Sequence, residues 1–199
     1  MINEKNIQKI KKHLRGFLPS ARFKHSLGVA KVALLLAKKY GISKGKAYVA
    51  ALLHDIGKGY TRNGMIKYIN KHRIKIDNKN DLIKYGISLA HGNISAHIAR
   101  NKFGVKDHEV LNAIISHTLG KPRMSKLAKI IYLADASSPD RRHPYVKKLR
   151  NRINLNLDNA LLYSMGNKLS YVLKKKKWIH PDAVKAWNSV IKKRNPNEI

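Results

Sequence analysis

The amino-acid sequence predicts an all-α fold in one domain. Apolar residues recur three or four positions apart over most of the 199 residues, which is the period of a helix buried along one face. No stretch alternates apolar and polar residues for long enough to build a sheet. Ser, Asp, Gly and Pro punctuate the apolar stretches at positions typical of helix starts and stops. No internal repeat or low-complexity linker divides the chain, so we expect a single domain over 1–199.

Four helices are expected in the N-terminal half, each with an inward-facing apolar stripe and a start or stop signal. The stripes are Ile7, Ile10, Leu14 and Phe17, stopped by Pro19; Leu27, Ala30, Leu34 and Ala37 within about 21–40, stopped by Gly41; Ala47, Ala50, Leu53 and His54 after a Ser43 N-cap, closed by Gly57; and Met65, Ile66 and Ile69 within 61–73.

Five helices are expected in the C-terminal half. The first, over about 92–103, ends at Gly104, and the second begins at Asp107 and leads through Ile114 and Ile115 to His117. A third, over 127–136, carries Asp135 near its end. Past Pro139 and Pro144, two further helices are predicted around 156–173 and 181–193. The segment 145–194 is expected to complete the fold.

The net charge, the lack of Cys and the lack of long apolar runs limit the kinds of protein that this chain could be. The chain has 42 Lys and Arg against 11 Asp and Glu, for a formal net charge of +31, which favours polyanionic partners such as phosphates or nucleic acid. Lys is abundant alongside Asn and Ile, so a biased base composition is the competing interpretation. No apolar run has the length of a membrane span, Cys is absent, and the first residues lack a signal-peptide core, which predicts a cytoplasmic protein. With only three Glu, carboxylate chemistry must use Asp.

The ordered set His25, His54-Asp55, His91, His117 and Asp135 is the main functional signal, because each residue lies beside an apolar helical run. Imidazole and carboxylate groups together bind iron, manganese or zinc and leave positions open for water or phosphate. The set therefore predicts a metal centre for hydrolysis. A second ion, held through His91 and His117, is an open alternative; these histidines could instead hold phosphate oxygens or donate a proton to a leaving group.

Positive side chains near this set are candidates for binding phosphate. The guanidinium groups of Arg22 and Arg141 match phosphate geometry, and Lys58 follows the His-Asp pair closely. A bound metal ion would lower the pKa of water to about 7. Hydroxide would then attack a phosphorus in line, while these cations stabilise charge on the equatorial oxygens. The remaining histidines, and Trp178 and Trp187, are interpreted as surface or packing residues.

The sequence resembles the HD-domain phosphohydrolases, and within them the YqeK-type symmetrical bis(5'-nucleosyl)-tetraphosphatases. The resemblance covers about 22–141 and is weaker around 180–188. It rests on Arg22-Phe23-Lys24-His25-Ser26-Leu27-Gly28-Val29-Ala30, Ala51-Leu52-Leu53-His54-Asp55-Ile56-Gly57-Lys58, His91-Gly92, Ala113-Ile114-Ile115-Ser116-His117-Thr118-Leu119-Gly120, Lys129-Ile130-Ile131-Tyr132-Leu133-Ala134-Asp135, Pro139 and Arg141. One departure is visible in the tail: where the family usually has Thr-x-Glu-Ala-x-Asn, this chain has Ala183-Val184-Lys185-Ala186-Trp187-Asn188.

This resemblance implies an HD-domain helical bundle that hydrolyses diadenosine tetraphosphate to two ADP. It implies iron, as one or two ions, with manganese or zinc as alternatives, and a C-terminal segment that covers the nucleotide. The implied metal ligands are His25, His54, Asp55 and Asp135. The implied catalytic residues are Asp55, His91 and His117. The implied nucleotide or phosphate contacts are Arg22, Asp55, Ile56, Gly57, Lys58, His91, His117, Thr118, Asp135 and Arg141.

Two other functions stay open at the level of sequence. The same metal chemistry could serve another nucleoside polyphosphate or a cyclic nucleotide. Alternatively, the +31 surface could make the chain a nucleic-acid-binding protein, whose affinity would fall steeply with salt. We expect no membrane partner, and a monomer or a homodimer.

Overall fold

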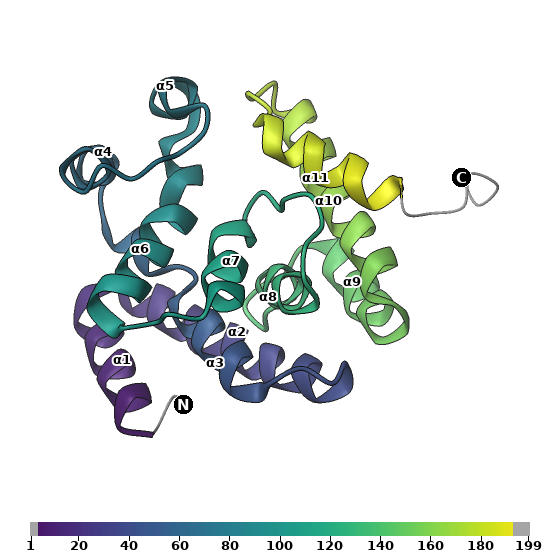
Figure 1. Ribbon diagram of the computed structural model, residues 1–199. Coiled ribbons are helices and arrows are strands. Elements are labelled where there is room, and N and C mark those ends of the chain that lie inside the picture. Colours follow the sequence, from purple (N-terminus) through teal and green to yellow (C-terminus); the bar gives the residue numbers. More distant parts are fainter. Residues whose placement is uncertain (1–3, 193–199) are drawn as a thin grey trace.

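Helices build the whole described part of the protein. The computed structural model describes residues 4–192, and within that range it contains helices and loops but no strand (Figure 1). The predicted all-α fold is confirmed. The α-helices are α1 (Glu4–Phe17), α2 (Ser20–Lys39), α3 (Lys44–Leu53), α4 (Arg62–Lys71), α5 (Lys79–Asp81), α6 (His91–Phe103), α7 (His108–Ser116), α8 (Lys126–Ala136), α9 (Pro144–Leu155), α10 (Leu157–Lys174) and α11 (Pro181–Ile191). Shorter turns are the 3-10 helices η1 (Ile56–Gly59) and η3 (Ile87–Ala90) and the π-helical turn η2 (Leu82–Gly86).

Side-chain caps set several helix starts. Ser43, Thr61 and Ser125 each accept a hydrogen bond from a backbone N–H in the first turn of α3, α4 and α8. Asp107 caps α7 in the same way, and Asn156 caps α10. Each such cap contributes about 1 kcal/mol, because it satisfies an N–H that the helix itself leaves unpaired.

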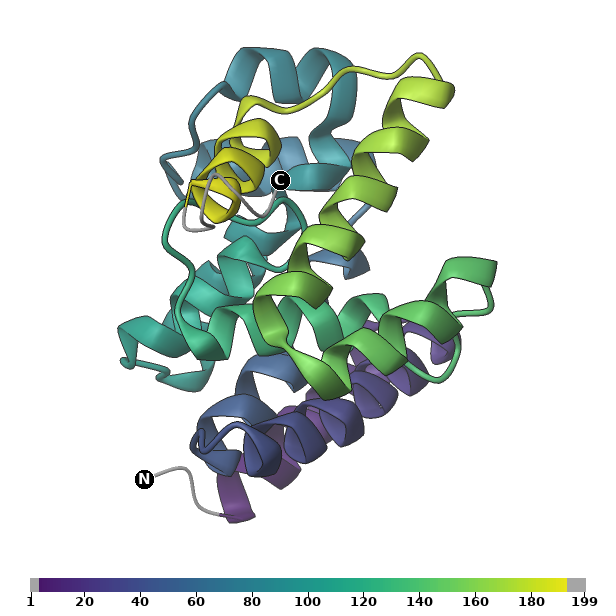
Figure 2. The same cartoon turned by 90° about the vertical axis from the view of Figure 1, so that its right-hand side faces the viewer.

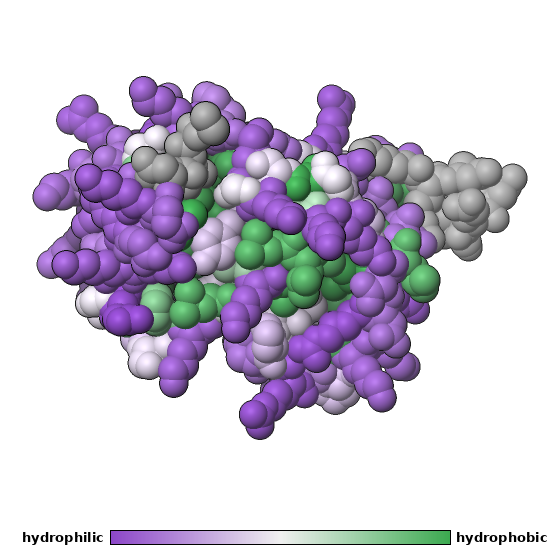
Figure 3. Space-filling model, turned by 90° about the horizontal axis from the view of Figure 1, so that it is seen from below, coloured by the Kyte–Doolittle hydropathy of each residue, from purple (hydrophilic) through white to green (hydrophobic). Residues whose placement is uncertain are grey.

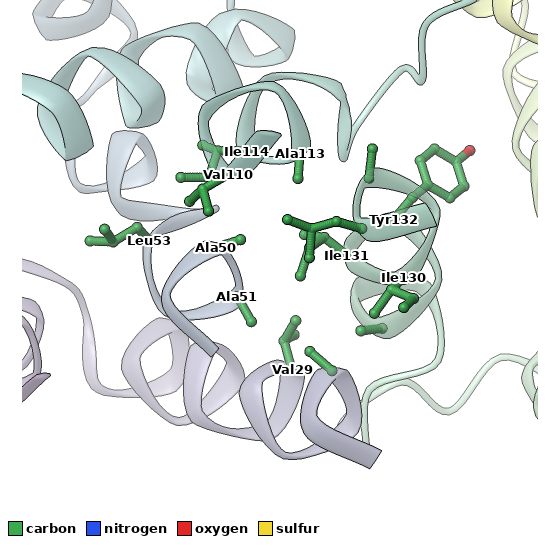
Figure 4. Packing of buried hydrophobic residues seen from close by; sticks show 14 of the residues in the cluster. Val29, Ala50, Ala51, Leu53, Val110, Ala113, Ile114, Ile130, Ile131 and Tyr132 are labelled. Atoms are coloured by element: carbon green, nitrogen blue, oxygen red, sulfur yellow. The ribbon is translucent and has the colours of Figure 1, made fainter. Parts of the chain in front are cut away.

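The core lies where α2, α3, α7 and α8 meet. Figure 4 shows Val29, Ala50, Ala51, Ile114 and Ile131 pointing into a common interior from these four helices. The many alanines in this core let the helix backbones approach closely. Tyr132, by contrast, points away from this centre, towards α10 (Figure 4). Figures 1 and 2 place α9, α10 and α11 together on one side of α8.

Four features differ from the sequence-based prediction. The segment 144–155 forms helix α9, which was not predicted; only Val146, Leu149 and Ile153 face inward among many basic residues. The third helix ends at Leu53 rather than at Gly57, because the chain tightens into η1 after His54. In α2 the most buried residues include Val29 and Ala33, whereas Leu27 and Leu34 are half-buried. Residues 79–90 form short α, π and 3-10 turns where no helix was expected.

Some predicted segments extend beyond the residues that the structure describes. Helix α11 ends at Ile191, and the predicted end at residue 193 lies outside the described residues, as does residue 194 of the predicted C-terminal segment. The N-terminal residues 1–3, read for a signal peptide, also lie outside it. Among the described helices, none combines the length and apolar character that crossing a bilayer requires. Hydrophilic side chains dominate the face in Figure 3, with a smaller apolar region among them.

Candidate metal centre

Five segments bring the predicted histidines and aspartates together. His25 lies in the second turn of α2, His54 and Asp55 follow α3, and His91 opens α6. His117 follows α7 directly, and Asp135 is the second-last residue of α8. All six side chains are buried, at 7% exposure or less. Four of these side chains lie at the C-terminal ends of helices, whereas His25 and His91 lie near helix starts.

Asp55 is the centre of the cluster, because its two carboxylate oxygens face different pairs of histidines. Oδ2 lies 3.8 Å from Nε2 of His25 and 3.7 Å from Nε2 of His54. Oδ1 lies 3.1 Å from Nε2 of His91 and 3.4 Å from Nε2 of His117. Two groups of three possible ligands result, one on each side of Asp55, and within each group the ligand atoms lie within 4.8 Å of one another.

A hydrogen bond from Nδ1 fixes the orientation of each of the four histidine rings. In His54, His91 and His117 this atom lies 2.5 to 2.7 Å from the carbonyl oxygen three residues earlier, to which it donates. In His25 it donates instead to Asp140, 2.9 Å from Oδ2. Because each Nδ1 carries its proton towards an acceptor, each Nε2 offers a lone pair to the cluster.

Asp135 completes the set on the side of His25. Its Oδ1 atom lies 3.1 Å from Nε2 of His25 and accepts a hydrogen bond from Arg141 at 2.6 Å. The Arg141 guanidinium also reaches the backbone oxygen of Asp135. The structure thus brings all four predicted metal ligands into one site, with Arg141 beside them.

Two further cations contact Asp55 itself. Nζ of Lys58 lies 3.0 Å from Oδ2, and a guanidinium nitrogen of Arg22 lies 3.4 Å from the same oxygen. Arg22 is 44% exposed and Lys58 23% exposed at the side chain, so both also reach the solvent side of the cluster. These cations are placed to meet an anion that approaches from solvent.

The other residues predicted to contact the nucleotide, Thr118, Ile56 and Gly57, border the histidine and aspartate cluster. The hydroxyl of Thr118 lies 3.1 Å from Nε2 of His91 and 3.0 Å from that of His117. Ile56 and Gly57 are buried in η1, and the N–H of Gly57 donates to the Ser95 hydroxyl. An added Cβ at Gly57 would lie 2.5 Å from the carbonyl oxygen of His91, so the close approach of η1 to α6 needs glycine.

Electrostatics keep the two carboxylates ionised. Burial alone would raise the pKa of Asp55, but the surrounding histidines, led by His54, and Lys58 hold that pKa well below its usual value. Burial likewise opposes ionisation of Asp135, and His25, His54 and Arg141 again hold its pKa well below normal. The site therefore presents two negative charges at neutral pH.

The pKa values of the histidines shift in different directions within this cluster. Burial lowers the pKa of His54 to about 4 and also lowers the pKa of His117, which favours the neutral form that binds metal. Burial acts in the same direction on His25, but Asp135 and the neighbouring carboxylates outweigh it and raise its pKa.

The donor set fits a divalent metal ion. Nε2 of His25, Nε2 of His54 and Oδ1 of Asp55 are buried and form no hydrogen bond. Buried polar atoms without partners cost free energy. A cation beside His25 and His54 would satisfy the two nitrogens, and one on the side of His91 and His117 would satisfy Oδ1 of Asp55. Nitrogen and carboxylate ligands in this mixture suit transition metals rather than calcium or magnesium.

An apolar cavity of about 430 Å³ adjoins this cluster through Thr118. Its walls come mainly from α10, α11 and the turn between them, and include Met165, Trp178 and Ala183. The Trp178 ring lies edge-on to His180 and tilted against Tyr85, with ring centres 5.1 Å and 5.9 Å apart. Trp187 lies elsewhere, against Gly166 and in a separate surface hollow.

Sequence reasoning missed three residues beside the cluster. Asp140 holds His25, Ser95 accepts from Gly57, and Lys168 on α10 lies against Thr118. Among these three residues, only Asp140 has a signal in the sequence, since it precedes Arg141 in the Pro-Asp-Arg run. Lys168 is one of 42 basic residues, and no sequence pattern separates it from the others.

Comparisons with known proteins agree with this geometry. The model of the HD domain family matches residues 22–140. A relative from Halalkalibacterium halodurans, named bis(5'-nucleosyl)-tetraphosphatase, symmetrical, is 37% identical over 94% of this chain and 96% of its own length. A relative of the same name from Bacillus subtilis is 31% identical over 87% of this chain and 91% of its own.

A solved structure is similar over nearly the whole chain. It is the crystal structure of a predicted HD superfamily hydrolase involved in NAD metabolism from Clostridium acetobutylicum. Its TM-score is 0.89 at 34% sequence identity, and the match covers 94% of this chain and 98% of that one. The family match spans more than half of the residues and includes the whole His and Asp set. The chain therefore belongs to the HD domain family.

Proposed function

We propose that the protein is a metal-dependent hydrolase that cleaves diadenosine tetraphosphate symmetrically into two ADP by attack of water on a phosphate. The observation that carries the proposal is the arrangement around Asp55, whose two oxygens face different histidine pairs beside three cations. The names of the relatives that match nearly end to end support the substrate and the symmetric cleavage.

His25, His54, Asp55 and Asp135 would hold the metal ion, which we propose is iron, with manganese and zinc as alternatives. A divalent ion there would lower the pKa of water to about 7 and so supply hydroxide at neutral pH. The cluster supports a second cation as well. Nε2 of His91 and Nε2 of His117 lie 2.9 Å apart, although both Nδ1 atoms already hold the ring protons. Two facing lone pairs at that distance need a shared proton or a cation between them.

The cations would bind the phosphate chain. Arg22, Lys58 and Arg141 would offer their donors to phosphate oxygens and stabilise the charge that builds up during attack. His91 and His117 would hold phosphate oxygens or protonate the leaving group if they do not ligate a second ion. Contacts from Ile56, Gly57 and Thr118 remain predictions of the resemblance.

The apolar cavity would receive one adenosine. Its size and the rings of Trp178, Tyr145 and His180 along its wall suit a purine base. In this proposal α10 and α11 cover the nucleotide, so residues 145–194 belong to the same functional domain as 22–141. A cytoplasmic setting, a monomer or homodimer, and binding of nucleic acid by the basic surface stay predictions of the sequence.

The test combines metal analysis with product identification. The full chain is purified without oxygen, its metal is quantified, and it is incubated with diadenosine tetraphosphate before chromatography. We expect two ADP from each substrate molecule and a turnover at least roughly 100-fold lower in Asp55→Asn, since even residues behind metal ligands matter 10- to 100-fold. Asp81→Asn, an exposed control, should match the wild type. ATP with AMP would contradict symmetric cleavage, and turnover in Asp55→Asn would contradict the site.

A further inference from the structure

Lys168 lies where the apolar cavity meets the histidine and aspartate cluster. Its Nζ atom donates to the backbone oxygen of Thr118 at 3.4 Å, and the Thr118 hydroxyl lies within 3.1 Å of Nε2 of both His91 and His117. The same ammonium lies 3.8 Å from the centre of the Tyr132 ring. Lys168 also lines the cavity. One side chain therefore borders both parts of the site.

The groups around the Lys168 ammonium contact it but supply no negative charge to neutralise it. Among the described residues, Lys168 has no carboxylate within ion-pair distance; its contacts are a carbonyl oxygen and a ring face. Burial lowers the pKa of Lys168 to about 8, opposed by Asp135, so the side chain is still mostly protonated at pH 7. A partly buried cation without an anion costs free energy, and an anionic ligand would offset that cost.

We propose that Lys168 binds the phosphate chain where it leaves the cavity for the metal centre, and thereby selects nucleotides over neutral nucleosides. This inference rests on the function proposed above. Arg22, Lys58 and Arg141 all contact the metal-side carboxylates, so they serve the reacting end of the chain. Lys168 comes instead from α10, which forms the cavity wall. It is the cation placed to meet phosphate nearest the ribose.

The test compares ADP with adenosine as ligands of the metal-loaded full chain, by titration calorimetry. Lys168→Met removes the charge and keeps most of the apolar stem. We expect it to weaken ADP binding about 10- to 100-fold, as loss of a hydrogen bond to a charged group does, and to leave adenosine binding unchanged. KM for diadenosine tetraphosphate should rise by a similar factor, with kcat changing less. Lys168→Arg should restore most of the affinity for ADP.

Two controls separate charge at this position from other effects. Lys174→Met removes a lysine from the exposed end of the same helix and should leave both affinities unchanged. Lys168→Gln keeps a donor for Thr118 and replaces Lys168→Met if the latter does not fold. Unchanged ADP affinity in the uncharged variant overturns the inference. Equal loss of ADP and adenosine also overturns it, because Lys168 would then only shape the cavity wall.

Failure of the proposed function gives a different result. In that case the wild type would leave diadenosine tetraphosphate intact, while its binding of ADP would still depend on Lys168. A wild type that turns over the substrate with no dependence on Lys168 rejects the inference alone. A metal-loaded wild type that binds neither nucleotide rejects both.

Discussion

Asp140 orients His25 by accepting a hydrogen bond from Nδ1 of the imidazole, 2.9 Å from its Oδ2 atom, on the side away from the cluster. The other three histidines of the cluster are held by backbone oxygens, so His25 alone depends on a side chain. Asp140 is also about half exposed at the side chain, which makes it accessible to substitution without disturbing the core.

Asp140→Ala should therefore weaken metal binding about 10- to 100-fold, the usual effect of removing a group that orients a ligating histidine. Asp140→Asn should lose less, because its amide oxygen still accepts from Nδ1. Metal affinity is measured by competition with a chelator. Asp81→Ala is the control for an exposed aspartate. Equal affinity in Asp140→Ala and the wild type would show that packing alone orients His25.

Gly57→Ala should destabilise the protein by about 1–3 kcal/mol, the usual cost of overpacking. The added Cβ would lie 2.5 Å from the carbonyl oxygen of His91, so η1 and the start of α6 must separate. Gly16→Ala is the matched control: nothing lies within 4 Å of its Cβ position in α1, and we expect a gain of about 0.5–1 kcal/mol. Urea unfolding measures both, and a Gly57→Ala protein as stable as the wild type would refute the clash.

Arg141→Met should keep its metal and lose roughly 10- to 100-fold in kcat/KM, because a charge-assisted contact to phosphate is removed. Arg141→Lys should recover only part of this loss, since an ammonium lacks the planar fork of the guanidinium. The exposed neighbour Arg142 supplies the control, Arg142→Met. Loss of metal from Arg141→Met would assign Arg141 to support of Asp135 instead.

The metal-free protein should lose stability as pH falls from about 6.5 to about 4. The pKa of His54 is about 4 in the folded state and about 6.5 in the unfolded chain, so in this window the unfolded state binds more protons. The contribution of this group is about 3 kcal/mol. His25 acts in the opposite direction, because its raised pKa gives stability that is present below about 6.5 and is lost as pH rises.

Comparison with His54→Gln isolates that contribution. The difference in free energy of unfolding between wild type and variant should shrink by about 3 kcal/mol between pH 7 and pH 4. His108→Gln, at an exposed position on α7, should run parallel to the wild type. A pH-independent difference between the wild type and His54→Gln would mean that His54 does not stay neutral in the fold.

The residues of the cluster could be singled out from the sequence because most of them lie at helix ends. N-caps such as Asp107 and Ser125 are local signals that set where α7 and α8 begin, and the apolar stripes that follow lead to His117 and Asp135 at the other ends of these helices. Helix α9 escaped prediction because three inward residues among many basic ones give a weak apolar period. Its existence depends on packing against α10, which is not a local property.

Other parts of the site depend on tertiary structure alone. Asp140 lies in an irregular loop, where no periodicity indicates which way a side chain points. The role of Lys168 follows from the approach of α10 to Thr118 and Tyr132. The cavity likewise brings Trp178, from the turn after α10, together with Leu89 and Thr118. Pairings of this kind, between segments distant along the chain, could not be inferred from a single sequence.

The convergence of five chain segments on one buried cluster has a consequence for the lifetime of the protein in a cell. An ion held there would join residues as far apart as His25 and Asp135, which unfolding separates. Ligands that bind only the folded state stabilise it by mass action, by about 2.7 kcal/mol at a free concentration 100 times the dissociation constant. A shortage of the metal would then lower the stability of the protein as well as its activity. The metal-free protein would unfold more often and be exposed to proteases. Its abundance would follow the supply of the ion.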